Sequence, residues 1–527
     1  MKKICFIRPP YVSSYNDNDV REETIITSFL GYLDSISYEG ATQIFDFHLD
    51  PSVSVQKILE YHSDVYIIAV RDVGDSYHYA MRIAASILNY TNAKVYFYGQ
   101  VSPLRHYPEL NSRVTIVNHS ERQLAESLGL DTEGAHFESD LQYCSYFHSL
   151  NLDDWQNREK RGCIETTRGC EHKCSFCFIN LGSNFEKKWQ IRSGYAIVSD
   201  IKKYLDQGIS KFVFLDSEFL GVRKVDHIEK TKLLNMIKDE LPPIRYSIWN
   251  RADTLLKFNQ FDLLKQSGLT KVLIGVESFF QEDLDILNKA TKSEWIEEAI
   301  IQLINRHIYC CLTFMTFNRN TTVESLRCNL STLERLHHQP NAKYLGVPHF
   351  TFNIEIARHN SDLDNQLSEK TYLRQLTMYR GQVDKNHVVF SKEFEPLAEI
   401  CRLLHYEWTM KKCRLNRSVK DSDSKTKYMV DNWFERLSLF CIEQLQKFLA
   451  WHEEGSLNYE NLAQARDELY RSLHNYHREF LPFNLSELET FENHASLIDY
   501  KGTLERESHG WDEKIPLLSS NFTDVFV

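Results

Sequence analysis

Apolar residues in the first 145 positions form short runs separated by amphipathic stretches. Five runs have the length and the β-branched or aromatic content of buried strands: 3–7, 43–47, 65–70, 94–98 and 114–117. Helical spacing of apolar positions separates them, over 27–33, 53–61, 77–88 and a stretch that begins near 121. Strands that alternate with helices in this way predict a doubly wound, parallel sheet of the Rossmann or flavodoxin-like kind.

The same alternation resumes after residues 146–160, a polar stretch without periodicity that we interpret as a linker. Strand-like runs follow at 162–166, 211–215, 244–249, 271–275, 310–314 and 349–356. Helical patterns lie between them at 196–207, 229–239, 261–266, 293–306 and 323–337. Right-handed crossovers would curl about six such repeats into a partial (β/α)6 barrel, fewer than the eight repeats of a closed barrel.

From residue 361 the pattern changes to amphipathic helices, the clearest at 439–453 and 462–476. We therefore expect a mostly helical C-terminal region over 361–527. The predicted organisation is an N-terminal domain at 1–145, a linker at 146–160 and an α/β core at 161–360. A length of 527 residues agrees with several domains rather than one hydrophobic core.

Charge and hydropathy bear on which partners and which cell compartment are expected for the chain. The net charge of −12 gives no general attraction to nucleic acid or anionic lipid, so a nucleic-acid substrate is not expected. Apolar runs stay well below the roughly 20 residues of a membrane span, and the run after Lys3 is too short for a secretory signal. We therefore expect a cytoplasmic protein without a membrane partner.

Three of the 12 cysteines form a tight cluster, with Cys170, Cys174 and Cys177 in a C-x3-C-x2-C pattern. Three thiolates on one short loop can bind three irons of a 4Fe–4S cubane and leave the fourth iron open to a ligand. The alternative is a structural zinc site that includes Cys163. Zinc ribbons use two separated cysteine pairs, whereas Cys163 lies in a predicted strand, so the pattern favours the iron–sulfur cluster.

The segment 165–177, ETTRGCEHKCSFC, resembles the signature of the radical S-adenosylmethionine (SAM) superfamily. Further landmarks are similar to this family in the same order: 212–218 (FVFLDSE), 249–253 (WNRAD), 273–278 (LIGVES) and 289–292 (KATK). The resemblance implies that Cys170, Cys174 and Cys177 hold the cluster and that SAM is cleaved reductively to a 5′-deoxyadenosyl radical. It also implies an electron donor such as flavodoxin or ferredoxin.

The same resemblance implies cofactor-binding roles for six other residues. Phe176 is the aromatic position expected against the adenine of SAM. Glu277 follows the fourth strand, where the family contacts the ribose or the amino group; a helix N-terminal charge is the alternative. Four further residues lie at predicted strand ends facing the presumed mouth of the barrel: Asp216, Glu218, Asn250 and Arg251. Arg251 could pair with the SAM carboxylate.

Residues 1–145 resemble the cobalamin-binding domain that precedes one subgroup of radical SAM cores. The resemblance rests on 4–10 (ICFIRPP), on 30–33 (LGYL) and on the turn at 117–121 (VNHSE). No D-x-H-x-x-G is present, as is normal in this subgroup. The pair of glycines after the fourth strand is reduced to Gly99-Gln100, and the glycine of the final turn is missing. Whether this domain binds cobalamin stays open.

Three functions are compatible with these patterns. The first is a cobalamin-dependent methyltransferase that acts on an unactivated carbon of a small-molecule or peptide substrate. The second is a cobalamin-free radical SAM dehydratase, epimerase or cyclase with a vestigial cobalamin-binding-like domain. The third is a non-catalytic zinc-binding protein, which has no need of the landmarks downstream of the cysteines.

Overall fold

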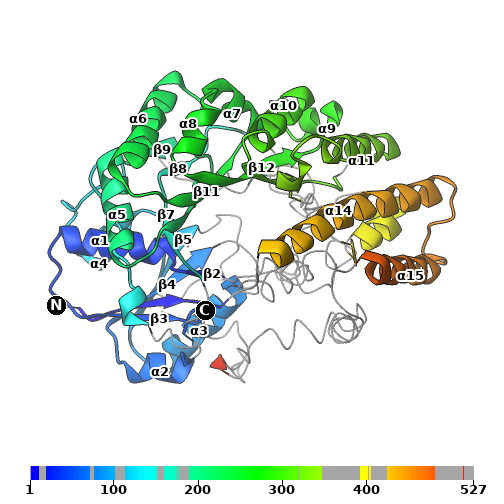
Figure 1. Ribbon diagram of the computed structural model, residues 1–527. Helices are drawn as coiled ribbons and strands as arrows, with labels where there is room; N and C mark the ends of the chain where they lie inside the picture. The colour runs from blue at the N-terminus through cyan, green and yellow to red at the C-terminus, as the bar shows by residue number, and fades with distance from the viewer. Residues whose placement is uncertain are drawn as a thin grey trace.

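Two parallel sheets and a group of C-terminal helices make up the described part of the chain (Figure 1). The computed structural model describes residues 2–10, 19–50, 52–71, 76–100, 113–150, 159–174, 177, 189–318, 320–346, 392–401, 403–404, 424–480 and 514–515. The N-terminal sheet lies below the second sheet in the view of Figure 1. This arrangement confirms the expected α/β class.

The N-terminal sheet has five parallel strands in the order β3-β1-β4-β5-β6. Its strands are β1 (Ile4–Arg8), β3 (Thr42–Asp46), β4 (Val65–Arg71), β5 (Lys94–Gln100) and β6 (Val114–Asn118). Its helices are α1 (Thr24–Ser35), α2 (Val55–Glu60), α3 (Ser76–Tyr90) and α4 (Glu121–Leu128). The strand order reverses between β1 and β4, and the crevice at such a switch point is where doubly wound sheets bind ligands.

Separate apolar clusters cover the two faces of this sheet. Ile83 and Ile87 of α3 belong to one cluster, and Phe29 of α1 and Leu124 of α4 belong to the other. Every third or fourth residue of these helices is apolar, so each helix buries one side. Helices on both faces confirm the doubly wound arrangement that the alternation of strands and helices predicts.

The second sheet is also parallel, in the order β13-β12-β11-β10-β7-β2. Its core strands are β7 (Glu159–Ile164), β10 (Lys211–Phe214), β11 (Arg245–Asn250), β12 (Leu269–Glu277) and β13 (Tyr309–Phe314). The strand predicted at 349–356 lies outside the described residues. Strand β2 (Asp19–Arg21) forms the edge of the sheet beside β7. This strand comes from the N-terminal region, and sequence periodicity did not predict it.

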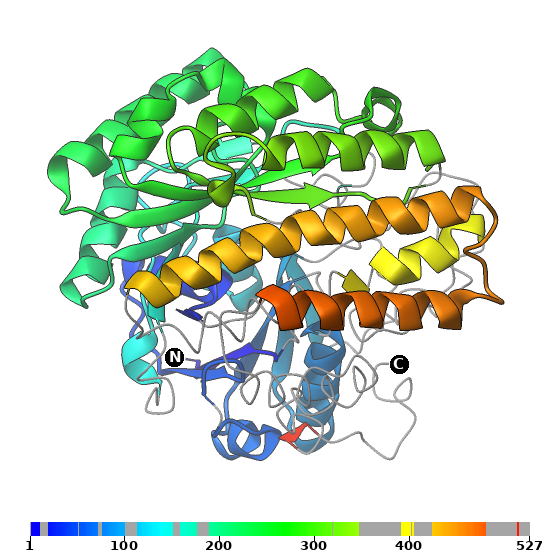
Figure 2. The ribbon, with the colours of Figure 1, turned by 45° about the vertical axis from the view of Figure 1, so that its right-hand side comes forward.

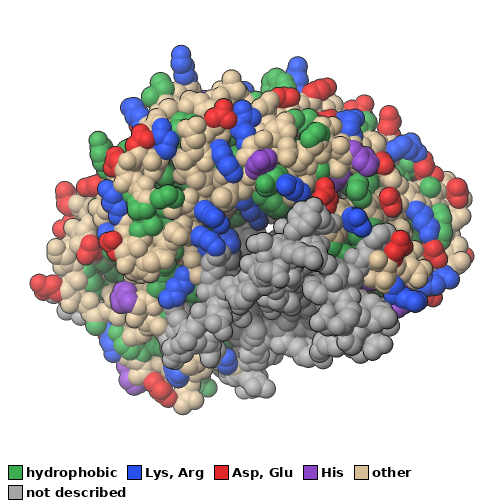
Figure 3. Space-filling view, in the orientation of Figure 1, with side chains coloured by type: hydrophobic (Ala, Val, Ile, Leu, Met, Phe, Trp, Pro, Cys, Tyr) green, Lys and Arg blue, Asp and Glu red, His purple; other side chains and the backbone are tan. Residues whose placement is uncertain are grey.

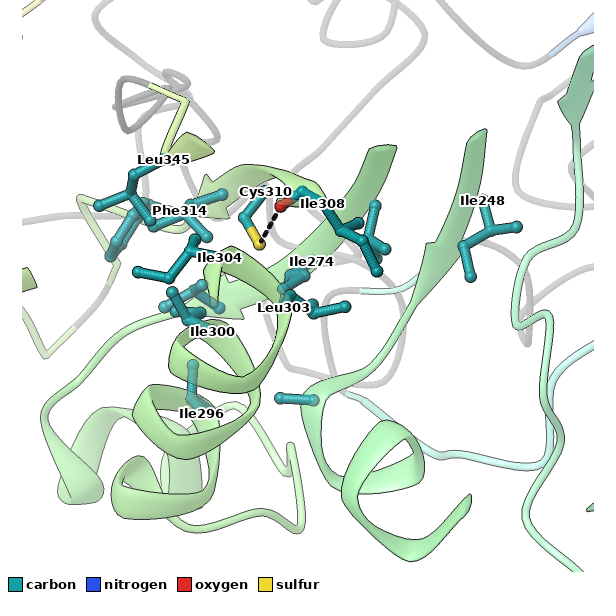
Figure 4. Packing of buried hydrophobic residues seen from close by; sticks show 14 of the residues in the cluster. Ile248, Ile274, Ile296, Ile300, Leu303, Ile304, Ile308, Cys310, Phe314 and Leu345 are labelled. Carbon is teal, nitrogen blue, oxygen red and sulfur yellow. Dashed lines mark hydrogen bonds between the residues drawn. The ribbon is translucent and has the colours of Figure 1, made fainter. Parts of the chain in front are cut away.

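Helices cover the second sheet between its strands: α5 (Gly194–Asp206), α6 (Lys224–Glu240), α7 (Ala252–Phe258), α8 (Phe261–Gln266), α9 (Gln281–Ile286), α10 (Ser293–Ile304) and α11 (Val323–His337). The apolar side of α10 packs on β12 and β13, where Ile300 and Leu303 lie close to Ile274 and Cys310 (Figure 4). These side chains are fully buried, so this layer forms the core beneath the strand ends. A short antiparallel hairpin, β8 (Thr167–Gly169) with β9 (Trp189–Ile191), flanks it.

The described C-terminal region is helical, as expected. Helix α14 (Ser424–Glu453) lies alongside α11, and α15 (Leu462–Phe480) packs on α14 (Figure 2). Short 3-10 helices are η1 (Phe147–Ser149), η4 (Ala342–Tyr344) and η5 (Lys392–Phe394). Ile515, near the C-terminus, is buried in the core of the N-terminal domain, and its carbonyl accepts a hydrogen bond from Arg82. The C-terminal region therefore contacts both sheets.

The molecular surface carries basic and acidic side chains interspersed on the face shown in Figure 3. No single-sign patch dominates the described part of that face. Among the described residues, no helix combines the length and the apolar character needed to cross a membrane.

Residues of the predicted linker pack between the two sheets where the structure describes them. Tyr146 and Phe147 are buried, and β7 begins at Glu159, before the predicted boundary at 160. The hydroxyl of Tyr146 donates to Asp46 at 2.9 Å and accepts from the amide of Glu23 at 2.7 Å. This segment is held against the N-terminal domain by specific hydrogen bonds.

Glu22, which follows β2, is the buried acid at this junction. Its carboxylate accepts hydrogen bonds from the hydroxyl of Tyr204 at 2.7 Å, the amide of Phe147 at 2.7 Å and the hydroxyl of Ser145 at 2.9 Å, and also from the amide of Tyr146. Burial nevertheless raises the pKa of Glu22 to about 7, although these hydrogen bonds favour the ionised form.

The raised pKa of Glu22 predicts a pH-dependent effect of Glu22→Gln. A carboxyl whose pKa rises from 4.5 to about 7 on folding stabilises the protein below about pH 4.5, and this contribution is lost as the pH rises through about 7. Between pH 5 and pH 8, the free energy of unfolding of Glu22→Gln should therefore rise relative to that of wild type, by up to about 3 kcal/mol. Urea unfolding of both proteins at pH 5 and pH 8 measures this change. A stability difference between variant and wild type that is the same at both pH values would contradict the prediction.

Candidate functional site

The cysteine loop begins directly after strand β8 of the hairpin. Gly169 ends that strand with φ of 80°, a left-handed conformation that suits glycine and turns the chain into Cys170. Cys170, Cys174 and Cys177 are all half-buried, and the amide of Cys177 donates to the carbonyl of Cys174 at 3.2 Å. The loop therefore lies beside the carboxyl ends of the second sheet, where parallel sheets place their ligands.

The far side of the loop is tied to the turn after α9. The side-chain amide of Asn288 donates to the carbonyl of Lys173 at 2.7 Å. Asn288 has φ of 48° and Ala290 has φ of 52°, so this turn contains two non-glycine residues in the left-handed region. Phe176 lies outside the described residues, and its expected contact with adenine stays a prediction.

The environment of Cys170 disfavours its free thiolate. Burial, followed by the charges of Glu218 and Cys177, raises the pKa of Cys170 to about 12. The guanidinium of Arg251 donates to the sulfur of Cys174 at 3.4 Å. A thiolate at Cys170 would need a neighbouring cation, and iron would supply it by displacing the proton.

The spacing of these side chains differs from that of a single-ion site. Within the described residues, no three His, Cys, Asp or Glu side chains are gathered closely enough to hold one metal ion. In a 4Fe–4S cubane each cysteine binds a different iron, so the sulfur atoms lie farther apart than around one ion. Three half-buried thiols on one loop are a donor set that fits a cubane.

Asp216, at the end of β10, holds the chain that leads into the loop. Its carboxylate accepts from the amides of Thr166 at 2.6 Å and Thr167 at 2.8 Å, and also from the hydroxyl of Thr166. Burial raises the pKa of Asp216, and the opposite charge of Lys230 acts against that rise. Asp216 is fully buried, and its described bonds are to the protein itself. Contact with SAM stays a prediction.

Glu218 bonds to the neighbouring strand end. Its carboxylate accepts from the hydroxyl of Thr254 at 2.5 Å and the amide of Arg251 at 3.2 Å. Its backbone carbonyl accepts from the hydroxyl of Thr167 at 2.9 Å and the indole of Trp189 at 3.1 Å. Burial raises the pKa of Glu218 to about 7. These bonds fasten both strands of the hairpin to the second sheet.

Asn250 and Arg251 end β11 and face different partners. Asn250 accepts from the amide of Leu220 at 3.0 Å and donates to the hydroxyl of Thr254 at 2.7 Å. Arg251 pairs with Asp253 at 2.9 Å. It also donates to the carbonyl of Lys289 and to the sulfur of Cys174. Of the four strand-end residues expected at the mouth, Arg251 bonds to the cysteine loop, and the charge of Glu218 acts on Cys170. Asn250 bonds instead to Leu220, which follows β10, and to Thr254 of α7.

Glu277 is held in a strained conformation at the end of β12. Its φ is 65°, and the pairing of β12 with β13 shifts register between Gly275 and Glu277. Its carboxylate accepts from the buried ammonium of Lys289 at 2.9 Å, and its carbonyl accepts from the amide of Met315 at 2.9 Å. Strain of this kind in a non-glycine residue is typical of binding sites.

Two buried hydroxyls, on segments that bond to Glu277, have no hydrogen-bond partner among the described residues. They belong to Thr291, in the turn after Lys289, and to Thr316, which follows Met315. A buried hydroxyl without a partner costs free energy, and a ligand that bonds to it would recover that cost. Sequence reasoning did not single out these threonines, although Thr291 belongs to the KATK landmark. The segments that carry them bond to Glu277, through Lys289 on one side and through Met315 on the other.

The switch point of the N-terminal sheet is described only in part. Gly99 has φ of 138°, and a Cβ there would lie 2.3 Å from the carbonyl oxygen of Val70 and 2.7 Å from Ile25. The strands themselves therefore require this glycine. Residues 11–18, 72–75 and 101–112, which come after β1, β4 and β5 in the chain, lie outside the described residues. The described strands therefore define the position of the switch point, and that position is the feature that bears on cobalamin binding.

The described bonds of Asp216 predict a structural effect of Asp216→Asn. Lys230 is fully buried and bonds to the hydroxyl of Thr166 at 2.5 Å, so the substitution leaves its charge without the opposing carboxylate. The free energy of unfolding should fall by about 3–5 kcal/mol. Urea unfolding measures the change. As a control, Asp262→Asn removes the exposed partner of Arg306 and should change little. Equal stability of Asp216→Asn and wild type would contradict the prediction.

Comparison with known proteins agrees with this geometry. The model of the radical SAM superfamily matches residues 164–327. The anaerobic magnesium-protoporphyrin IX monomethyl ester cyclase of Rubrivivax gelatinosus is 29% identical over 160 residues, 30% of this chain and 28% of that protein. The uncharacterized methyltransferase PH0819 of Pyrococcus horikoshii is 26% identical over 145 residues, 26% of this chain and 29% of that protein. The matches thus span less than a third of these relatives.

Solved structures share the fold over more of the chain. The cobalamin-dependent SAM radical enzyme OxsB, with aqua-cobalamin and SAM bound, has a TM-score of 0.61 at 15% identity and covers 99% of this chain and 85% of that chain. The radical SAM methyltransferase TsrM of Kitasatospora setae, with cobalamin and a 4Fe–4S cluster bound, has a TM-score of 0.50 at 16% identity and covers 64% of this chain and 73% of that chain.

The family match implies a 4Fe–4S cluster and SAM as cofactors. The shared architecture consists of a doubly wound N-terminal domain, a radical SAM core and further helices. Residues 164–327 are thus a radical SAM domain, and the fold of the chain is similar to that of cobalamin-dependent radical SAM enzymes.

Proposed function

We propose that this protein is a cobalamin-dependent radical SAM methyltransferase acting on an unactivated carbon of a small-molecule or peptide substrate. The observation that carries the proposal is a direct contact between the carboxyl edges of the two sheets, where parallel sheets bind ligands. The cysteine loop follows β8 at the carboxyl edge of the second sheet, and Arg168 of β8 bonds to Glu121, which follows β6 at the carboxyl edge of the N-terminal sheet. Ligands at the two edges would share one substrate space.

Cys170, Cys174 and Cys177 are proposed to hold three irons and to leave the fourth open for the amino and carboxylate groups of SAM. When bound, the cluster supplies the single electron that cleaves SAM to the 5′-deoxyadenosyl radical. The guanidinium of Arg251, 3.4 Å from the sulfur of Cys174, places a positive charge beside the cluster position. That charge favours thiolate ligands and the more negative, reduced cluster.

SAM itself is proposed to lie along the ends of β12 and β13. Glu277 offers a carboxylate to an amine or a ribose diol, and the hydroxyls of Thr291 and Thr316 offer hydrogen bonds that the described protein leaves unmade. Phe176 is proposed to pack on the adenine. Asp216, Glu218 and Asn250 support the site by holding the loop and the strand ends.

Cobalamin is proposed to bind at the switch point of the N-terminal sheet, as the likeness of the fold to OxsB and TsrM favours. When bound, it supplies a carrier for the methyl group. The cyclase relative supports a second candidate, a radical rearrangement or ring closure without methyl transfer. In both cases a flavodoxin or ferredoxin is the proposed donor of the low-potential electron, and the cytoplasm is the proposed location.

The cluster assignment predicts that Cys174→Ala abolishes formation of 5′-deoxyadenosine, because one iron loses its protein ligand. Liquid chromatography of anaerobic reactions with SAM and a chemical reductant measures this product. Cys163→Ala is the matched control, since Cys163 is a buried cysteine of β7 outside the loop. It should keep the cluster and the activity. Wild-type levels of product from Cys174→Ala would refute the assignment.

The methyltransferase proposal predicts that the reconstituted protein retains cobalamin. Protein prepared anaerobically with hydroxocobalamin and then desalted should show corrinoid absorption beside the broad absorption of the iron–sulfur cluster. With methyl-deuterated SAM, the label should appear in the substrate. Cluster absorption without corrinoid would overturn methyl transfer and favour the rearrangement. Zinc without iron would overturn the whole assignment.

A further inference from the structure

Arg168 is buried between the two domains, two residues before the first cysteine of the loop. Only 6% of its surface is exposed. Its two terminal nitrogens donate to the two carboxylate oxygens of Glu121 at 2.8 and 2.7 Å. Glu121 begins α4 of the N-terminal domain. This bidentate pair fixes both the distance and the orientation of the partners, which a single contact would not do.

A second set of contacts surrounds the same guanidinium on its other sides. Arg168 donates to the carboxylate of Glu165 at 3.0 and 3.1 Å and to the hydroxyl of Tyr143 at 3.1 Å. The hydroxyl of Tyr143 in turn donates to Glu165 at 2.7 Å. The ring of Phe137 lies 4.1 Å from the guanidinium carbon. The head group of Arg168 is therefore surrounded by fixed partners.

Charge complementarity strengthens this arrangement. Burial alone would raise the pKa of Glu121, but the charge and hydrogen bonds of Arg168 outweigh it and lower that pKa well below its usual range. The carboxylates of Glu121 and Glu165 lie 2.7 and 3.0 Å from the same guanidinium nitrogen, so the buried charge of Arg168 is paired from two sides. His119 also faces both acids, at 3.6 Å from Glu121 and 3.8 Å from Glu165. A buried pair in this state is costly to break, so it resists displacement of either partner.

The covalent path from this pair to the cluster position is short. Arg168 lies in β8, whose pairing with β9 spans Thr167 to Gly169, and Cys170 follows immediately. We infer that Arg168 is a positioning residue that sets the cysteine loop relative to the N-terminal domain and holds the loop where SAM can be cleaved. The inference rests on the proposed role of Cys170, Cys174 and Cys177.

The chemistry explains why an arginine is needed. A lysine could neutralise one carboxylate but cannot form the paired bonds to Glu121 and reach Glu165 at the same time. Arg168→Lys thus keeps the buried charge and removes the orientation. Glu121→Gln removes the charge on the other side and keeps the size of the side chain.

Glu22→Gln is the matched control. Glu22 is also a buried carboxylate that joins the N-terminal region to the core, through Tyr204 of α5, but none of its described bonds reaches the cysteine loop. A general loosening of the interface would affect all three variants. Loss of positioning would affect only Arg168→Lys and Glu121→Gln.

The experiment uses the full-length protein after anaerobic reconstitution. Iron and sulfide content, the kcat and KM for 5′-deoxyadenosine formation with a chemical reductant, and the electron paramagnetic resonance spectrum of the reduced cluster with and without SAM are measured. Arg168→Lys and Glu121→Gln should load the cluster but lower kcat by about 10- to 100-fold, with an altered SAM-induced change in the spectrum. Glu22→Gln should match wild type in each measurement.

The outcomes separate this inference from the proposed function. An active wild type together with an equally active Arg168→Lys that has the wild-type spectrum would overturn the positioning role alone. A wild type that neither loads a cluster nor cleaves SAM would overturn both. If Arg168→Lys does not fold, Tyr143→Phe removes one hydroxyl of the network and leaves all charges in place. It should lower kcat in the same direction by a smaller factor, and an unchanged kcat would overturn the role.

Discussion

The buried pair of Arg168 and Glu121 is the interaction on which the organisation of the molecule depends. It joins the carboxyl edges of two sheets, each of which would by itself be an ordinary ligand-binding edge. Two buried charges remain stable only while they stay paired and hydrogen-bonded, so the two domains are held in one relative position. Because Arg168 directly precedes the cysteine loop, this constraint on domain position also acts on the proposed catalytic centre.

Around that pair, several buried carboxylates organise the loop and the strand ends. Asp216 bonds to two successive amides before the loop, Glu218 fastens the β8–β9 hairpin, and Glu22 holds the N-terminal segment that adds β2 to the second sheet. Burial of a carboxylate is unfavourable unless its oxygens accept hydrogen bonds, and these oxygens do. The hydroxyls of Thr291 and Thr316, which have no partner among the described residues, lie on segments that bond to Glu277, where SAM is proposed to bind.

The apolar periodicity of the chain predicted most of the regular structure. Each of the five N-terminal strands lies within two residues of its predicted position, and α8 and α11 have the predicted bounds. Such elements bury one face, so their apolar residues recur at the period of the helix or strand and can be recognised in the sequence. Strand β2, the β8–β9 hairpin, α7, α9 and the first half of α14 were missed. Strand β2 and each strand of the hairpin are only three residues long, too short for a period to be visible, and their partners are distant in the chain.

The sequence by itself indicated the radical SAM domain, the cysteine triplet and the alternation of strands and helices, because these depend on local spacing and local apolar pattern. Only the tertiary structure decided how the polar residues at the strand ends are used. Asp216, Glu218 and Asn250 bond to backbone and hydroxyl groups of neighbouring segments, and Arg251 reaches the sulfur of Cys174. Their contact with SAM stays a prediction. The partner of a buried polar group is set by which strand ends lie side by side, and that depends on the packing of the whole sheet.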